Sequence, residues 1–215
     1  YIDTLENISP SDENAEGFVG ARYMPLIYLK EDKKKLFAKH FNVAGNDIEF
    51  MTDSQSNLAA FMRRLVVARF ESSLAAFKIT LDNMILSSES ILKWYREKGI
   101  VPLWKRGHIP DPDNFDLNNS ENDSDFGDDA FEQQLIKMQE EGLLVVKADY
   151  LKPIFIEKLE KDILLLKQIR SKWEKITPEH DPKLSGIKEE IAKQLKNDPK
   201  RKIIIFSQYA DTVSY

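Results

Sequence analysis

A hydrophobic seam between Phe70 and Tyr95 is the feature that most limits how this chain can fold. Its members recur at alternating steps of four and three: Phe70, Leu74, Phe77, Leu81, Met84, Ser88, Ile91 and Tyr95. This spacing is typical of a coiled-coil seam. It predicts a long helix from about Ser54 to Lys98, broken once at most, that needs a partner helix. Unbroken, it would reach about 65 Å at 1.5 Å per residue.

Signals at both ends delimit this helix. Thr52 is followed three residues later by Gln55, as in a capping box. Gly99 is a typical stop residue. We therefore expect the helix to start just after Thr52 and to end at Gly99.

The best partner helix is predicted from Leu151 to Trp173. Its apolar residues recur every three or four positions: Ile156, Leu159, Ile163, Leu166, Ile169 and Trp173. Lysines and arginines interleave with acidic residues on the other positions, so we expect a solvated outer face with ion pairs. A shorter helix is expected from Asp129 to Glu141, ending at Gly142.

The segment from Asp111 to Glu132 holds nine acidic residues and no basic one. Such a composition predicts a solvated loop. A nucleic-acid mimic or a docking site for a basic partner is the alternative interpretation.

Near the N-terminus, the polar residues 1–20 predict a loose segment. Ala21 to Leu29 has strand-like content, but Pro25 limits a strand there to a sheet edge, and a helix starting near Pro25 is the competing prediction. Lys33 to Phe41 predicts a short amphipathic helix with Leu36, Phe37, His40 and Phe41 on one side.

The last elements resemble half of a wound α/β sheet. Asp181 and Pro182 predict a helix start, Leu184, Ile187, Ile191 and Leu195 its buried stripe, and Asn197-Asp198-Pro199 its end. The unbroken apolar run from Ile203 to Phe206 is typical of a strand buried on both faces. We expect it to pair with Ala21 to Leu29 or with another copy of the chain, and we expect the chain to be a fragment of a larger α/β protein.

Composition excludes several functions. The 215 residues contain no cysteine, so disulfides, thiolate zinc sites and cysteine nucleophiles are excluded. The net charge of −5 argues against a uniformly basic nucleic-acid coat, and the three histidines are too scattered for a local metal motif. No apolar run approaches the length of a membrane helix and no signal-peptide pattern is present, so a soluble, cytoplasmic protein is expected.

Motifs that carry chemistry are also missing from the sequence. None of the eight glycines precedes a lysine, so a Gly-Lys-Ser/Thr phosphate loop is absent. No GxSxG or HExxH pattern occurs, and no acidic DExx box that could hold magnesium appears at the end of a predicted strand. We predict no catalytic residue, no metal site and no cofactor for this chain alone.

Three stretches resemble one family. Asp181 to Tyr215, with Lys183-Leu184 and the run from Ile203 through Phe206-Ser207-Gln208, is similar to the start of the second motor lobe of Swi/Snf-type superfamily-two helicase-like ATPases, including motif IV. Phe61 to Phe77, which contains Arg69-Phe70-Glu71-Ser72-Ser73, looks like the preceding helix in a bacterial branch of that family. Ala21 to Phe41 has the same order of elements, a strand followed by a helix, as the part of that family that precedes this helix. Together these cover somewhat more than half of the chain.

The resemblance implies a role in DNA binding. In that family motif IV lies near the nucleic-acid backbone, so Ser207 and Gln208 are the candidate phosphate contacts and Lys200, Arg201 and Lys202 could add charge. A capped strand end beside a solvated basic turn is the alternative. Arg63, Arg64 and Arg69 could face DNA, but we favour pairing with acidic residues.

The chain departs from the family between about Ile100 and His180, which would be a helical insertion. The Walker A and DExx motifs of the first lobe and the glutamine-arginine motif VI of the second are absent as well. ATP and magnesium are therefore implied for a larger protein only, and this chain by itself is expected to be inactive and to bind DNA weakly.

These observations give one combined prediction. The fold is mainly α: a long antiparallel, coiled-coil-like helical protrusion with a small β element near Tyr23 to Leu29 and the first helix-strand unit of a RecA-like lobe. Its parts are residues 1–53, the protrusion 54–180 with the acidic loop near 110–130, and the truncated lobe 181–215. The function is that of a segment of an ATP-dependent DNA translocase whose protrusion braces the motor or receives a protein partner. The alternative is a helical adaptor whose strand adds to a partner's sheet.

Overall fold

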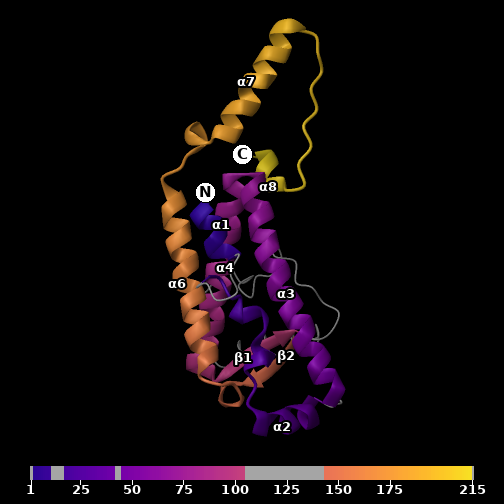
Figure 1. Cartoon of the computed structure of the whole chain (residues 1–215), viewed down its shortest axis with the longest axis vertical. Coiled ribbons are helices and arrows are strands. Elements are labelled where there is room, and N and C mark those ends of the chain that lie inside the picture. The colour runs from indigo at the N-terminus through magenta and orange to yellow at the C-terminus, as the bar shows by residue number, and fades with distance from the viewer. Residues whose placement is uncertain (1, 11–16, 42–44, 105–142, 215) are drawn as a thin grey trace.

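A computed structural model describes residues 2–10, 17–41, 45–104 and 143–214. The fold is mainly helical, as predicted, with one small antiparallel sheet in this described part (Figure 1). The α-helices are α1 (Ile2–Ile8), α2 (Glu31–Phe41), α3 (Gly45–Ser72), α4 (Leu74–Lys93), α6 (Ile154–Glu174), α7 (Pro182–Asn197) and α8 (Ala210–Ser214). The strands are β1 (Ile100–Trp104) and β2 (Leu143–Lys147).

Three long helices, α3, α4 and α6, form the body of the molecule. The chain ascends in α3, reverses, descends in α4 to the β1–β2 sheet and ascends again in α6 (Figure 1). Helix α6 thus lies antiparallel to α4, which confirms the predicted partner helix at Leu151 to Trp173. Ion pairs join their outer faces: Arg170 Nε lies 2.8 Å from Asp82 Oδ1 and Lys167 Nζ lies 2.5 Å from Glu89 Oε1.

The reversal between α3 and α4 occurs at Ser73. This residue is extended, with φ −158° and ψ 158°, and its Oγ accepts a hydrogen bond of 3.1 Å from the N–H of Ala76. A serine that satisfies a free N–H of the next helix is a strong N-cap. The predicted helix is therefore broken once, and the single 65 Å rod is replaced by two antiparallel helices.

The predicted seam is buried despite this break. Seven of its eight members are buried and Tyr95 is half-buried. The seam faces α6, whose buried residues are Phe155, Leu159, Asp162, Ile163, Leu166 and Ile169. The apolar interior consists of an upper cluster around Phe77 and a lower one around Phe155. The apolar spacing therefore identified the core correctly.

The predicted start of the long helix was wrong. Helix α3 already begins at Gly45, and Thr52 donates a hydrogen bond of 2.8 Å to the carbonyl of Ile48 one turn earlier. The side-chain Oε1 of Gln55 accepts a hydrogen bond from the N–H of Leu26, at 2.9 Å, and so serves a distant segment. The stop at Gly99 is confirmed: it follows a π-helical turn, η3 (Trp94–Lys98), with φ 65°.

The edge strand predicted at Ala21 to Leu29 was also wrong. This segment forms two 3-10 helices, η1 (Ala21–Tyr23) and η2 (Pro25–Tyr28), which confirms the competing prediction of a helix starting near Pro25. Only Leu29 forms an isolated bridge, to Leu151. The β element is instead the β1–β2 pair, with register from Ile100 opposite Lys147 to Trp104 opposite Leu143. The predicted loose N-terminal segment contains helix α1, in which Ile8 is buried.

Helices α2 and α7, which lie at the two ends of the helical body (Figure 1), agree in part with the predictions from the sequence. Helix α2 confirms the predicted short helix, with Phe37 fully buried, but Leu36 is 47% exposed rather than facing inward. Helix α7 starts at Pro182, and the carboxylate of Asp181 accepts hydrogen bonds from the N–H groups of Lys183 and Leu184, as predicted. Its expected buried stripe is uncovered, because Ile187 and Leu195 are each 39% exposed.

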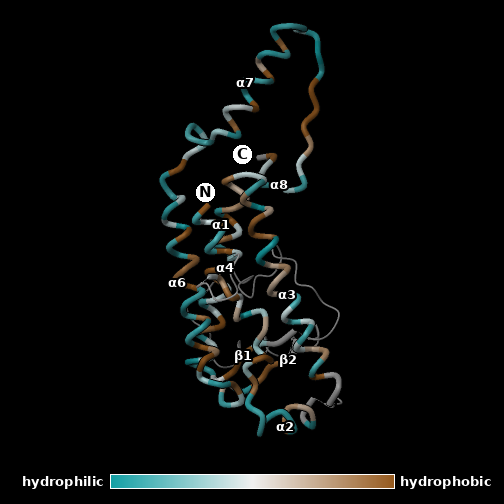
Figure 2. The backbone as a smooth tube through the Cα atoms, viewed as in Figure 1, coloured by the Kyte–Doolittle hydropathy of each residue, from teal (hydrophilic) through white to brown (hydrophobic). Residues whose placement is uncertain are grey.

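The predicted strand from Ile203 to Phe206 does not form. Residues 201–207 are extended without regular secondary structure, and Ile204 and Phe206 are 75% and 89% exposed. Figure 2 shows this apolar segment descending beside α7, away from the helical body. Pairing with Ala21 to Leu29 is thus wrong, because that segment is 3-10 helical and its Leu29 bridges Leu151. Pairing with another copy stays a prediction.

Two predictions lie outside the described residues: the helix from Asp129 to Glu141 and the acidic segment from Asp111 to Glu132. Among the helices that the structure describes, none is both long and apolar enough to cross a membrane.

Candidate functional site

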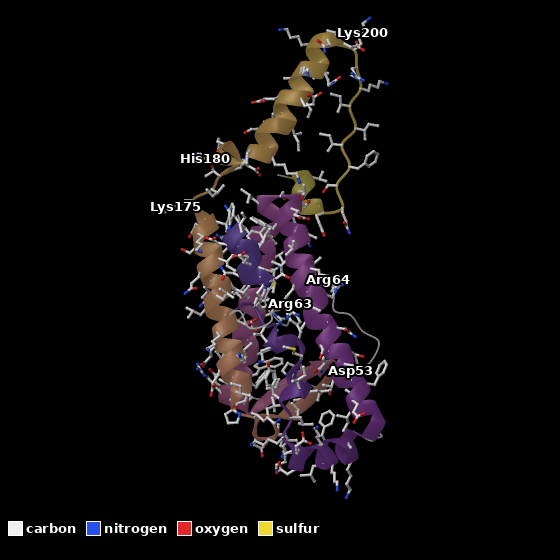
Figure 3. All side chains as sticks on the ribbon, viewed as in Figure 1. Asp53, Arg63, Arg64, Lys175, His180 and Lys200 are labelled. Carbon is white, nitrogen blue, oxygen red and sulfur yellow. The ribbon has the colours of Figure 1, made fainter. Side chains whose placement is uncertain are left out.

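The predicted DNA-contact residues lie along the segment that links α7 to α8. Lys200, Arg201 and Lys202 are exposed at the far end of α7, where Figure 3 labels Lys200. The N–H of Lys200 donates to Asp198 Oδ1 at 3.1 Å, and the guanidinium of Arg201 donates to Gln194 Oε1. These contacts fix the turn that ends α7, and the three cationic side chains face solvent.

Ser207 and Gln208 lie at the opposite end of this extended segment. Ser207 is half-buried, and its Oγ accepts a hydrogen bond of 3.2 Å from the N–H of Tyr209, just before α8. Gln208 is exposed between them. An extended chain rises about 3.3 Å per residue, so Arg201 and Ser207 are up to roughly 20 Å apart. The structure thus brings Ser207 and Gln208 together but separates them from the basic turn.

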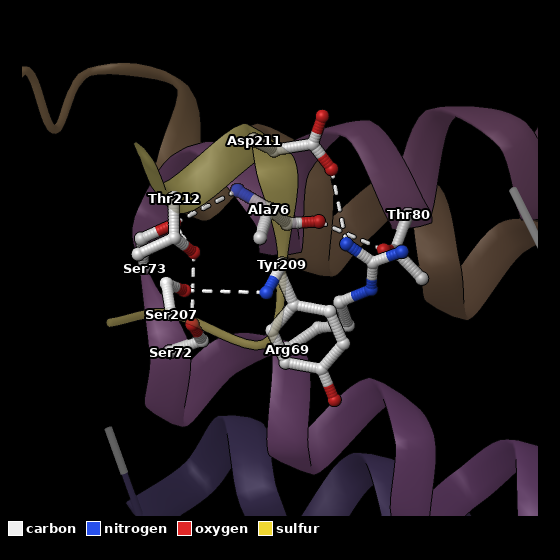
Figure 4. A network of polar contacts seen from close by, with 9 residues as sticks. All are labelled: Arg69, Ser72, Ser73, Ala76, Thr80, Ser207, Tyr209, Asp211 and Thr212. Atoms are coloured by element: carbon white, nitrogen blue, oxygen red, sulfur yellow. Dashed lines mark hydrogen bonds and ion pairs between the residues drawn. The ribbon is translucent and has the colours of Figure 1, made fainter. Parts of the chain in front are cut away.

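Helix α8 contacts the corner between α3 and α4, and Figure 4 shows the polar network that joins them. Nη1 of Arg69 lies 3.0 Å from Asp211 Oδ2, and the guanidinium carbon of Arg69 lies 4.2 Å from the centre of the Tyr209 ring. The Arg69 side chain is 2% exposed and that of Asp211 30%. A buried guanidinium requires a counter-charge, and Asp211 supplies one.

Hydroxyl groups complete the contact at this corner. The Oγ1 of Thr212 lies 2.8 Å from the Oγ of Ser72 and 2.8 Å from the Oγ of Ser73. The ammonium of Lys183, at the start of α7, donates to the carbonyl oxygens of Glu71 and Ser72, the latter at 3.0 Å. We call the group formed by Arg69, Ser72, Ser73, Tyr209, Asp211 and Thr212 the corner network.

The three arginines of α3 have separate environments. Arg69 pairs with an acidic residue, Asp211, as favoured from the sequence. Arg63 Nη1 donates to the carbonyl of Val19 at 2.9 Å. Arg64 is exposed (Figure 3). Arg64 is therefore the one of the three that the structure leaves facing solvent.

Titratable groups in the interior serve the fold. Asp162 on α6 is buried and accepts hydrogen bonds from the N–H groups of Val19 and Ala21. Burial raises the pKa of its carboxyl to about 6. Its oxygens point into the N-terminus of η1 rather than toward a cavity, so this carboxylate binds backbone and holds η1 against α6.

The described residues contain no group of three or more histidine, cysteine, aspartate or glutamate side chains that could hold a metal ion. One open pocket of about 450 Å³ lies between α2 and α3, where Lys34, Lys35, Glu49 and Asp53 give it mixed charge. The residues that line this pocket include no paired acid and base and no phosphate loop, which hydrolysis would require.

Comparisons of the chain with protein families, curated proteins and solved structures gave no match. Tyr209, Asp211 and Thr212 were not singled out from the sequence. No sequence pattern marks these residues, because they matter through Arg69, which lies 142 positions before Asp211 in the chain. Their role is visible only once the two segments are seen in contact.

Proposed function

We propose that this chain is a segment of a Swi/Snf-type ATP-dependent DNA translocase, comprising a helical protrusion and the start of the second motor lobe. The observation that supports the proposal most is the corner network. It joins two stretches that resemble the family, Arg69 to Ser73 and the residues that follow Phe206-Ser207-Gln208, although more than a hundred positions separate them. In this proposal they form one unit.

The uncovered apolar surface of residues 182–206 gives further support. Helix α7 has apolar side chains every three or four positions, followed by an apolar extended segment with Phe206 89% exposed. An amphipathic helix followed by an apolar extended run is the pattern of a helix-strand unit in an α/β sheet. In this chain the apolar sides of both are exposed. The sheet they require would be supplied by further strands of the motor lobe.

In the proposed function, Ser207 and Gln208 contact the phosphate backbone of DNA, and Lys200, Arg201 and Lys202 add positive charge. The body formed by α3, α4 and α6 braces the lobe or receives a protein partner. ATP and magnesium bind to other parts of the motor, because this sequence has no Gly-Lys-Ser/Thr loop. Such a motor works where the DNA is, in the cytoplasm of a bacterium.

The full reading frame provides the first test. It should encode a Gly-Lys-Ser/Thr loop before these residues and a glutamine-arginine motif after them. Its product should hydrolyse ATP faster when duplex DNA is added, whereas the 215-residue chain should not hydrolyse ATP. A reading frame without these motifs, or an ATPase rate that DNA leaves unchanged, would contradict the proposal.

The exposed segment from Ile203 to Phe206 favours a second candidate, a helical adaptor whose strand adds to the sheet of another protein. This candidate requires neither motif in the reading frame. It predicts that a partner's sheet edge protects the amides of residues 203–206 from hydrogen exchange while ATP and DNA have no effect.

A further inference from the structure

We infer that Arg69 is a positioning residue: through Asp211 and Tyr209 it fixes the segment carrying Ser207 and Gln208 to the corner between α3 and α4. The inference rests on the proposed function where it concerns DNA. It goes beyond that function by assigning a role to the corner network, which would transmit the position of the helical body to the DNA contacts.

The burial of Arg69 supplies the driving force for this attachment. Its side chain is 2% exposed, and moving a cation out of water is costly unless a counter-charge compensates. Asp211 provides that charge at 3.0 Å, and the Tyr209 ring lies 4.2 Å from the guanidinium carbon. If α8 left the corner, Arg69 would lose both contacts at once.

The hydroxyl contacts fix the register of α8. Thr212 Oγ1 lies between Ser72 and Ser73, at 2.8 Å from each Oγ. Ser73 is also the N-cap of α4, since its Oγ accepts the N–H of Ala76. The same serine therefore ends one helix, starts the next and holds α8.

The attachment reaches Ser207 through the backbone. Tyr209, held by Arg69, donates its N–H to Ser207 Oγ at 3.2 Å. Helix α8 has only five residues and would not be stable alone in water. The placement of residues 207–212 relative to the body therefore depends on the corner network.

Asp211 is the better position to test, because replacing the buried Arg69 risks unfolding the body. In the 215-residue chain, Asp211→Asn removes the charge and Asp211→Glu keeps it. Thr212→Val and Thr212→Ser form a second matched pair, which removes or keeps the hydroxyl. Hydrogen exchange should be followed at the amides of Thr212 and Val213, which donate to the carbonyl of Tyr209.

We expect exchange at these two amides to rise roughly tenfold or more in both loss variants. Asp211→Asn removes the counter-charge of the buried Arg69, and Thr212→Val removes the hydroxyl that contacts Ser72 and Ser73. Asp211→Glu and Thr212→Ser should stay within about threefold of the wild type, and amides of α4 and α6 should not change. Unchanged exchange at Thr212 and Val213 in Asp211→Asn would overturn the inference and leave the proposed function standing.

The DNA arm uses the product of the full reading frame and measures affinity for duplex DNA over a range of salt concentrations. Asp211→Asn and Ser207→Ala should each weaken binding severalfold with an unchanged salt slope, and the double variant should be no weaker than the stronger single one, because both act on one contact. Lys200→Ala should instead lower the salt slope by about 1.

An effect of Ser207→Ala without one of Asp211→Asn would overturn the positioning role alone. If neither substitution changes the affinity, the proposed DNA contacts and the inference are both overturned.

Discussion

The carboxylate of Asp162 accepts a hydrogen bond of 2.7 Å from the backbone N–H of Ala21, 141 positions earlier in the chain. The other carboxylate oxygen accepts the N–H of Val19 at 2.8 Å. A single side chain of α6 thus satisfies the free N–H groups at the start of η1. This contact fixes the N-terminal segment against the helical body, at the place where the sequence pattern predicted an edge strand.

Asp162→Ala should destabilise the protein by about 3 kcal/mol at neutral pH, because two buried N–H groups would lose their acceptor. Urea unfolding followed by circular dichroism measures this change. Glu160→Gln is the matched control on the same helix: Glu160 pairs with Arg96 on the surface, and its loss should cost less than about 1 kcal/mol. Equal effects of the two substitutions would contradict the role of Asp162.

The stabilisation that Asp162 provides should fall as pH rises. Burial raises the pKa of this carboxyl from 3.8 to about 6, since desolvation outweighs the hydrogen bonds from Ala21, Val19 and Gly20. The folded state therefore binds one more proton than the unfolded state between these values. The pH-dependent part of the contribution is complete below pH 3.8 and is lost as pH rises through about 6, whereas the hydrogen bonds to the backbone remain at neutral pH.

About 2 kcal/mol of this contribution should disappear between roughly pH 4.5 and pH 7.5. The measurement is the difference in unfolding free energy between the wild type and Asp162→Ala at both pH values, which removes the contributions of other groups. Carboxyl NMR should show the Asp162 resonance titrating near 6. A difference that grows with pH would show that hydrogen bonding, and not desolvation, dominates at this carboxyl.

Local spacing in the sequence predicted the helices well, because the interior of the body is built from contacts that repeat every three or four residues. Phe77 and Leu81 on α4 and Leu159 on α6 were all assigned to buried faces and are fully buried. The stop at Gly99 also depends only on the residue itself, whose φ of 65° few other residues adopt.

Contacts between distant segments could not be predicted in this way. Gln55 matched a capping box, but its side-chain Oε1 accepts a hydrogen bond from the buried N–H of Leu26, 29 positions earlier in the chain. Ile203 to Phe206 matched a buried strand, but a strand forms only where another strand pairs with it. Asp211 had no pattern to mark it, since its importance comes from the burial of Arg69.

Two glycines should respond in opposite directions to alanine. A Cβ at either Gly99 or Gly186 would meet no atom within 4 Å, so only the backbone conformation matters. Gly99 has φ 65°, and Gly99→Ala should destabilise the protein by about 1 kcal/mol in urea unfolding. Gly186 lies inside α7, and Gly186→Ala should slow hydrogen exchange in that helix roughly two- to fivefold. Destabilisation by both would indicate that side-chain crowding dominates.

Substitution of Phe206 should separate stability from association. Phe206 is 89% exposed, whereas Phe77 is fully buried in the upper cluster beside Phe70 and Trp173. Phe206→Ser should therefore change the unfolding free energy by less than about 0.5 kcal/mol, while Phe77→Ala should cost about 3 to 5 kcal/mol. Because an exposed apolar run with unpaired backbone groups promotes association, Phe206→Ser should also reduce concentration-dependent light scattering of the 215-residue chain. A large loss of stability on Phe206→Ser would mean that residues 203–206 pack against the body in solution and are not the uncovered surface described above.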